Sequence, residues 1–215
     1  MAESTASQIY KVLKRRILTG EIPPEQQLIE TALAEELQVS RTPIREAIAL
    51  LKKDRLVIPV QSGGVITRDV SLELKDILGV RKALETYAIK TAIDLISPAQ
   101  IAELERICEQ SRTLKTGDIE ARARLNTEFH ERIVAAARNP RLYQMWLECR
   151  EFFLIAQQSY APDFGGFHQH DSILDAVRQR DKALAEKLIN EHLDLSLASV
   201  MNAHAGVMRR DRLTT

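Results

Sequence analysis

The sequence predicts a mainly α-helical fold in two parts: a small N-terminal unit of three helices with a β-hairpin, then an all-α antiparallel helical bundle. Three observations lead to this prediction. Apolar residues recur at helical spacing along most of the chain. Short runs rich in Val and Ile, typical of strands, occur only before residue 70. Gly and Pro, with 8 and 7 copies among 215 residues, cluster at short breaks between the helical stretches.

Composition limits the classes of function. Lys and Arg together number 30, as do Asp and Glu, so any affinity for DNA must come from the local placement of basic residues. Cys108 and Cys149 lack metal-binding or disulfide spacing, which favours free thiols in a reducing compartment. The N-terminal residues do not resemble a signal peptide, and no run approaches the roughly 18 apolar residues of a membrane span. We therefore expect a cytoplasmic protein without a membrane partner.

Residues 1–70 are expected to form a winged helix-turn-helix, a fold that commonly binds DNA. Gly20 is placed to end the first helix, and Ser40 is a good N-cap for the third. Pro59 indicates that the first strand lies at an edge of its sheet. The predicted helices cover residues 7–19, 29–37 and 40–54, and the predicted strands cover 57–60 and 65–67, joined by the wing Gln61-Ser62-Gly63-Gly64.

Residues 71–215 are expected to form an all-helical domain for effector binding and dimerisation. Ser71 and the pair Ser97-Pro98 are typical helix starts. Because the breaks between helices are short, neighbouring helices should run antiparallel. The predicted helices cover residues 71–96, 99–115, 119–138, 141–160, 168–180 and 182–203.

The third helix of the N-terminal unit has the residues of a recognition helix. Its inward face is apolar, whereas its first turn presents Ser40, Arg41, Thr42 and Arg45. Arg suits bidentate contact with guanine, and hydroxyls and helix N-termini suit phosphates. The alternative is an amphipathic helix with solvated arginines. We favour DNA binding because the helix spacing, the N-cap and the wing agree with it.

These residues resemble the GntR family of bacterial regulators. The core of the resemblance is "LAEELQVSRTPIREAIALL" at residues 33–51, within a stretch that ends at Thr67. The resemblance implies operator contacts by Ser40, Arg41 and Arg45, by Thr31 at the start of the second helix, and by the wing. Many relatives have Arg near the position of Thr31. Arg55 stands where Gly commonly ends the helix in the family, so we expect local strain there.

Three histidines of the C-terminal part lie on inward-looking helix faces. They are His130, His170 and His192, and Asn126 lies one helical turn before His130 on the same face. Imidazole is the commonest protein metal ligand, and three imidazoles leave a coordination position open. Each histidine alone is more often a hydrogen-bonded core residue. The residues alone therefore leave a shared metal site and a structural role open.

The C-terminal part resembles the FCD effector domain of FadR/VanR-type regulators over nearly all of residues 71–200. The matching segments are "NTEFHERIVAAARNPRL", "HDSILDAV" and "NEHLD". The resemblance implies that His130, His170 and His192 bind a divalent metal, with Asn126 where the family has Asp. The amide oxygen of Asn126 can still ligate but carries no charge, which favours an anionic effector. Imidazole ligands suit Zn²⁺ or Ni²⁺ better than Mg²⁺.

Arg81 lies in the apolar stripe of the long helix over residues 71–96. A buried guanidinium needs a partner. One interpretation is an ion pair with Glu85, four residues later; the other is a guanidinium fork that holds an effector carboxylate. The segment "RKALE" resembles the family pattern R-x-x-L-E, in which Arg is common. Both interpretations stay open at this point.

The sequence as a whole predicts a ligand-responsive transcription repressor that binds a palindromic operator as a homodimer and senses a small organic acid at a histidine-based metal site. The alternatives are a metalloenzyme-like domain and a domain that senses the metal itself. Glu128 is two residues from His130 and points elsewhere on the helix, so the site lacks a general base with motif support. We therefore predict no enzymatic activity.

Overall fold

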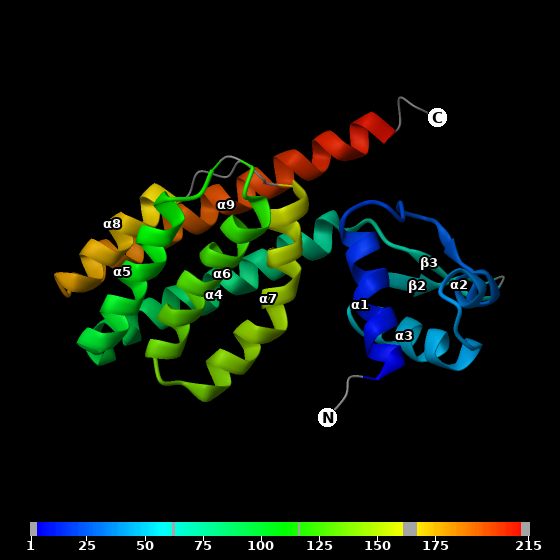
Figure 1. Ribbon diagram of the computed structural model, residues 1–215, viewed down its shortest axis with the longest axis horizontal. Helices are drawn as coiled ribbons and strands as arrows, with labels where there is room; N and C mark the ends of the chain where they lie inside the picture. Colours follow the sequence, from blue (N-terminus) through cyan, green and yellow to red (C-terminus); the bar gives the residue numbers. More distant parts are fainter. Residues whose placement is uncertain (1–3, 62, 116, 161–166, 212–215) are drawn as a thin grey trace. The chain divides into compact units, whose positions relative to one another are not determined.

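The computed structural model describes residues 4–61, 63–115, 117–160 and 167–211. The chain forms two compact units, and the change from the first to the second falls between Leu74 and Lys75 (Figure 1). The second unit ends at Gly206. Helices dominate both units, which confirms the predicted fold class.

The first unit contains three helices and a small sheet, in the order of a winged helix-turn-helix. Its elements are α1 Thr5–Leu18, β1 Gln27–Leu28, α2 Glu30–Glu36, α3 Arg41–Lys53, β2 Val57–Pro59 and β3 Val65–Thr67. Helix α1 starts at Ser4, whose side chain accepts a hydrogen bond from the Ser7 amide. Gly20 follows its end with a φ of 80°, as the sequence predicts. Leu13 of α1 and Ile44 and Leu51 of α3 form the fully buried core between these helices.

The sheet has the order β1-β3-β2, with both pairings antiparallel. Pro59 therefore lies on an edge strand, as predicted. Strand β1 is an addition, because the sequence predicts only two strands here. Its two residues, Gln27 and Leu28, pair with Ile66 and Val65 and are too few to show an alternating pattern. Arg55 has a φ of 58°, the left-handed conformation that its glycine-like position predicts.

The second unit is an all-helical bundle, and it includes most of α4, which begins in the first unit. Its helices are α4 Val70–Leu95, α5 Pro98–Arg112, α6 Ile119–Ala136, α7 Pro140–Tyr160, α8 Phe167–Arg178 and α9 Lys182–Asp211. Ser97 and Gln100 form a reciprocal capping box at the start of α5, next to Pro98. The ends of α9 differ most from prediction, since this helix continues eight residues beyond the predicted end at residue 203. The segment from Arg209 to Asp211 is helical.

Helices α4 and α9 are joined by polar pairs that recur once per helical turn. From one end to the other these pairs are Lys82–Asp194 at 2.5 Å, Thr86–Asn190 at 3.0 Å, Lys90–Glu186 at 3.1 Å and Asp94–Lys182 at 2.5 Å. Each step of four residues forward along α4 is a step of four residues backward along α9. The two helices are therefore antiparallel and in a fixed register.

No helix among the described residues is long and apolar enough to cross a membrane. Cys108 and Cys149 are free thiols, as their spacing predicts. Burial raises the pKa of Cys108 to about 12, which makes its thiol unreactive.

The packing of α1 on α3 gives a test of the first unit. We expect Leu13→Ala to lower the free energy of unfolding by about 2–5 kcal/mol, because Leu13 is 0% exposed and its removal leaves a cavity. The adjacent Val12 is 45% exposed, so Val12→Ala is the matched control and should change the free energy by less than about 0.5 kcal/mol. Urea denaturation followed by circular dichroism measures both. Equal effects of the two substitutions would contradict this core assignment.

Candidate DNA interface and candidate metal centre

The first turn of α3 presents the predicted DNA-binding side chains at the surface of the first unit. Arg41, Thr42 and Arg45 are exposed, and Ser40 occupies the N-cap position in extended conformation. The Ser40 hydroxyl makes no capping hydrogen bond with the helix. It therefore remains available to an external acceptor such as a phosphate oxygen.

Glu30, at the start of α2, lies between the two arginines of α3. Its Oε2 accepts a hydrogen bond from Arg41 Nη2 at 3.0 Å, and its Oε1 lies 4.0 Å from Arg45 Nε. The arginine side chains remain 63% and 72% exposed, so water screens these ion pairs and they hold the arginines weakly. Sequence analysis did not identify Glu30. It lies next to Thr31, which is exposed on the same first turn of α2.

The wing between β2 and β3 exposes backbone groups in a narrow turn. Gln61, Gly63 and Gly64 are exposed, and both glycines have positive φ, 89° and 86°. Gln27 Nε2 of β1 donates a hydrogen bond to the Gly63 carbonyl at 3.4 Å. Ser62, also predicted to contact DNA, lies outside the described residues. The described part of the wing is slim, without large side chains at its tip.

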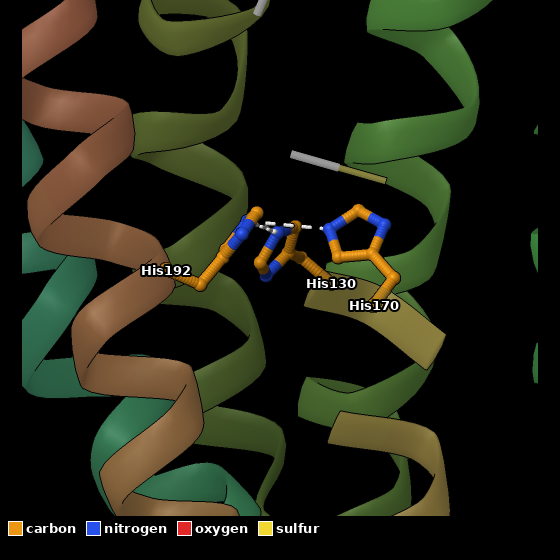
Figure 2. Close-up of side chains that lie close together, drawn as sticks. All are labelled: His130, His170 and His192. Carbon is orange, nitrogen blue, oxygen red and sulfur yellow. Dashed lines mark hydrogen bonds between the residues drawn. The ribbon is translucent and has the colours of Figure 1, made fainter. Parts of the chain in front are cut away.

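The second unit brings the three predicted histidines together from three helices. His130 of α6, His170 of α8 and His192 of α9 are 0%, 0% and 1% exposed. Their Nε2 atoms face one another, at 3.0 Å between His130 and His192 and 3.2 Å between His170 and His192 (Figure 2). The aromatic ring of Phe129 stacks on His170 with ring centroids 4.1 Å apart. Asn126 is also buried, at 4% exposure, one turn before His130.

Neighbouring residues determine which nitrogen of two histidines carries the proton. His130 Nδ1 lies 2.6 Å from Glu85 Oε2. Burial alone would raise the pKa of Glu85, but the charges of Arg81 and His130, with hydrogen bonds from His130 and Trp146, hold it far below its usual value. An ionised carboxylate can only accept, so His130 Nδ1 is protonated. His192 Nδ1 lies 2.9 Å from the amide oxygen of Gln169 and is protonated for the same reason.

Burial keeps the three imidazoles neutral. It lowers the pKa of His130 below its usual value, and it lowers those of His170 and His192 well below it. A neutral imidazole with its proton on Nδ1 has a lone pair on Nε2. The lone pairs of His130 and His192 thus face each other across 3.0 Å, an arrangement that repels unless a cation lies between them.

The donor set fits a divalent transition metal. Nitrogen ligands about 2.0–2.1 Å from one metal are separated from each other by about 2.9–3.4 Å for tetrahedral to octahedral angles. The observed separations of 3.0 and 3.2 Å lie in this range. The three ligating atoms lie within 4.8 Å of one another, and all three residues are buried. Second partners that hold the Nδ1 protons, Glu85 and Gln169, are typical of histidines that bind metal.

Arg81 lies beside this cluster and makes the ion pair that the sequence left open. Its Nε donates to Glu85 Oε1 at 2.7 Å, and its guanidinium carbon lies 4.0 Å from the centroid of the Phe153 ring. Arg81 is 0% exposed, yet its Nη1 and Nη2 atoms have no hydrogen-bond partner among the described residues. The ion pair therefore uses one edge of the guanidinium and leaves the other edge able to bind a carboxylate.

Glu85 joins these parts, and sequence analysis gave it a role only as the partner of Arg81. Its Oε1 also accepts a hydrogen bond from Trp146 Nε1 of α7 at 2.8 Å. One buried carboxylate thus contacts Arg81, Trp146 and His130, from α4, α7 and α6. The available signal was the spacing of Arg81 and Glu85 on a buried helix face, which does not reveal the contact with His130.

Together, a winged helix-turn-helix with exposed arginines and a helical bundle with a buried ligand site define a DNA-binding transcription regulator. The sequence comparisons agree. Residues 5–66 match the model of the bacterial regulatory proteins of the gntR family, and residues 76–195 match the FCD domain. The chain belongs to the GntR family and carries an FCD domain. Members with these two domains are transcription regulators and not enzymes.

Several relatives align over most of their length. The chain is 28% identical to the transcriptional repressor GlaR of Escherichia coli, covering 92% of this chain and 96% of GlaR. It is 23% identical to the gluconate operon repressor of Bacillus subtilis, covering 89% and 83%. Among solved structures, E. coli McbR/YncC superposes with a TM-score of 0.68 at 23% identity, covering 94% and 99%. A GntR family member from Pseudomonas syringae gives a TM-score of 0.60 at 21% identity, covering 98% and 89%.

The bridge formed by Glu85 gives a test of the candidate metal centre. We expect Glu85→Gln to weaken zinc binding about 10–100-fold, because the carboxylate that fixes the protonated nitrogen of His130 is lost. Glu120→Gln, at the start of α6, is the control and should bind zinc like the wild type. Calorimetric titration with Zn²⁺ measures both, and circular dichroism verifies folding. Wild-type zinc affinity in a folded Glu85→Gln variant would contradict this role for Glu85.

Proposed function

We propose that this GntR-family regulator is a repressor that binds a palindromic operator as a homodimer and responds to a small carboxylate effector. The observation that carries the proposal is the buried fork of Arg81, whose Nη1 and Nη2 lack partners beside a metal-compatible histidine cluster. A buried guanidinium with two free donors is costly unless a ligand satisfies it. We assign DNA binding to residues 1–70 and effector binding with dimerisation to residues 71–215, and we place the protein in the cytoplasm with its operator.

The DNA contacts follow from the chemistry of the first turn of α3. Arg41 and Arg45 are proposed to contact guanine edges in the major groove, displacing Glu30 from their side chains. The hydroxyls of Ser40 and Thr42, with Thr31 of α2, are proposed to contact phosphates. The wing, Gln61 to Gly64, is proposed to approach the backbone or the minor groove. One winged domain reads only a short half-site, which is why a dimer on a palindrome is expected.

The effector site combines Arg81 with the three histidines. We propose that His130, His170 and His192 hold one divalent metal, Zn²⁺ or Ni²⁺, with Asn126 as a weak or water-mediated ligand. When bound, this metal supplies positive charge and an open position for an oxygen ligand. The charges of Arg81 and Glu85 cancel, the imidazoles are neutral, and Asn126 adds no charge. The site as a whole then attracts an anion, and Arg81 orients its carboxylate through Nη1 and Nη2.

Helix α4 provides a route from the effector to DNA. It carries Arg81 and begins at Val70, three residues after the last residue of β3. A ligand that draws on Arg81 would favour one position of α4 over another, and the response at the operator can be only as large as that preference. The unpartnered fork favours an organic anion as the signal over the metal alone.

Substitutions in α3 test the DNA contacts. Arg41→Ala and Arg45→Ala should each lower operator affinity by about 1–3 kcal/mol, since each removes a contact with a base edge. Lys52→Ala, near the end of α3, should weaken binding to all sequences alike. The control is Arg124→Ala in the second unit, where the arginine is also highly exposed. Gel-shift titrations that show unchanged operator affinity for both α3 variants would contradict the recognition-helix assignment.

Substitutions among the proposed ligands test the metal centre. The double variant His130→Ala/His192→Ala should lose zinc, because two of the three imidazole ligands are gone. Asn126→Asp should bind zinc more tightly, since it adds a charged ligand, whereas the control Asn202→Asp, exposed on α9, should not. Elemental analysis after chelator-free purification and calorimetry with Zn²⁺ or Ni²⁺ measure these effects. If the wild type takes up neither ion, the histidines form a metal-free pocket.

A further inference from the structure

Helix α4 has an exposed face opposite to the one that carries Arg81 and Glu85. This outer α4 face comprises Asp76, Gly79, Val80, Ala83, Tyr87 and Lys90, all exposed. Val80 and Tyr87 remain 46% and 54% exposed, which is unusual for large apolar side chains. Their positions, 76, 80, 83, 87 and 90, alternate steps of four and three, the spacing of a helix that packs along another helix.

The centre of the outer α4 face is low and its two ends are charged. Gly79 and Ala83 leave a hollow on the surface that Tyr87 and Thr86 also line, with Asn190 of α9 at its side. A Cβ atom at Gly79 would have nothing within 4 Å, so this space is open. An apolar centre with small residues and a charged rim is the pattern of a protein interface. The helices of the described second unit leave it uncovered.

We propose that the outer α4 face packs antiparallel against the same face of a second copy of this chain, about a two-fold axis at Ala83. Antiparallel symmetry about residue 83 pairs each position with the one equally far on the other side. Tyr87 then lies over the partner's Gly79, so a large side chain fills the open hollow. Asp76 lies opposite the partner's Lys90, so opposite charges meet at both ends. This inference deepens the proposed homodimer by assigning its contact surface.

Charge and size select this register over its neighbour. An axis displaced by half a turn, to residue 85, would place Asp76 opposite the partner's Asp94 and Ala83 opposite the partner's Tyr87. Like charges would then face each other at both ends, which is unfavourable. In the register about Ala83, Lys90 keeps its own contact with Glu186 and gains a second carboxylate from the partner. The face is thus complementary to itself, as a two-fold interface requires.

The register brings effector site and interface onto one helix. Arg81 and Glu85 lie on the inner face of α4, within one turn of Ala83 on its outer face. A displacement of α4 at the effector site would therefore be transmitted directly to the second copy, without an intervening element.

A cysteine at the axis tests the proposal. Helices that pack through small residues approach to about 8 Å between axes, which brings facing Cα atoms within the roughly 4–7 Å that a disulfide spans. Ala83→Cys in the full chain should form a covalent dimer on mild oxidation, visible on a non-reducing gel. Ala99→Cys, an equally exposed alanine at the start of α5, and the wild type with Cys108 and Cys149 are the controls. Both should remain uncrosslinked.

A charge at the axis tests the same contact in the opposite sense. Ala83→Glu places two carboxylates against each other and should raise the dimer dissociation constant by more than about tenfold in sedimentation, whereas Ala99→Glu should not. Circular dichroism verifies that both variants fold. A dimeric wild type with no crosslink at residue 83 and no effect of Ala83→Glu would overturn this interface and leave the proposed repressor function standing. A monomeric wild type, with and without DNA, would overturn the dimer of the proposed function as well.

Discussion

The second unit is arranged around one buried negative charge, the carboxylate of Glu85. Two of its partners, Arg81 of α4 and Trp146 of α7, donate to Oε1, and the third, His130 of α6, lies against Oε2. A buried charge that loses a partner costs about 3–5 kcal/mol, so these three side chains must be in place whenever the unit is folded. The direction of the Arg81 fork and the tautomer of His130 are consequences of this requirement.

Helix α4 gives these contacts a functional meaning because each of its faces meets a different partner. Its inner face carries Arg81 and Glu85, and its edge is joined turn by turn to α9, the helix that holds His192. Its outer face is the surface proposed for the second copy. A ligand bound between Arg81 and the histidines would thus contact the two helices whose relative position is fixed by polar pairs. Small displacements there would be felt along the whole of α4.

The first unit contrasts with the second because its signals are local. Gly20 with its positive φ, the N-cap at Ser40 and Pro59 on an edge strand act within a few residues of the chain, and each was predicted correctly. The missed element, β1, has two residues whose pairing partners lie about forty positions later. Glu30 was missed for the same reason, since its contacts with Arg41 and Arg45 depend on how α2 packs on α3.

The sequence by itself determined the helical periodicity, the winged helix order and the inward positions of Arg81 and the three histidines, because these follow from residue spacing and from motifs that resemble a known family. Only the tertiary structure decided which atoms meet. The convergence of three Nε2 atoms, the contact of Glu85 with His130 and the two unpartnered nitrogens of Arg81 depend on the packing of α4, α6, α8 and α9. No local pattern encodes such contacts, since each joins helices that are distant along the chain.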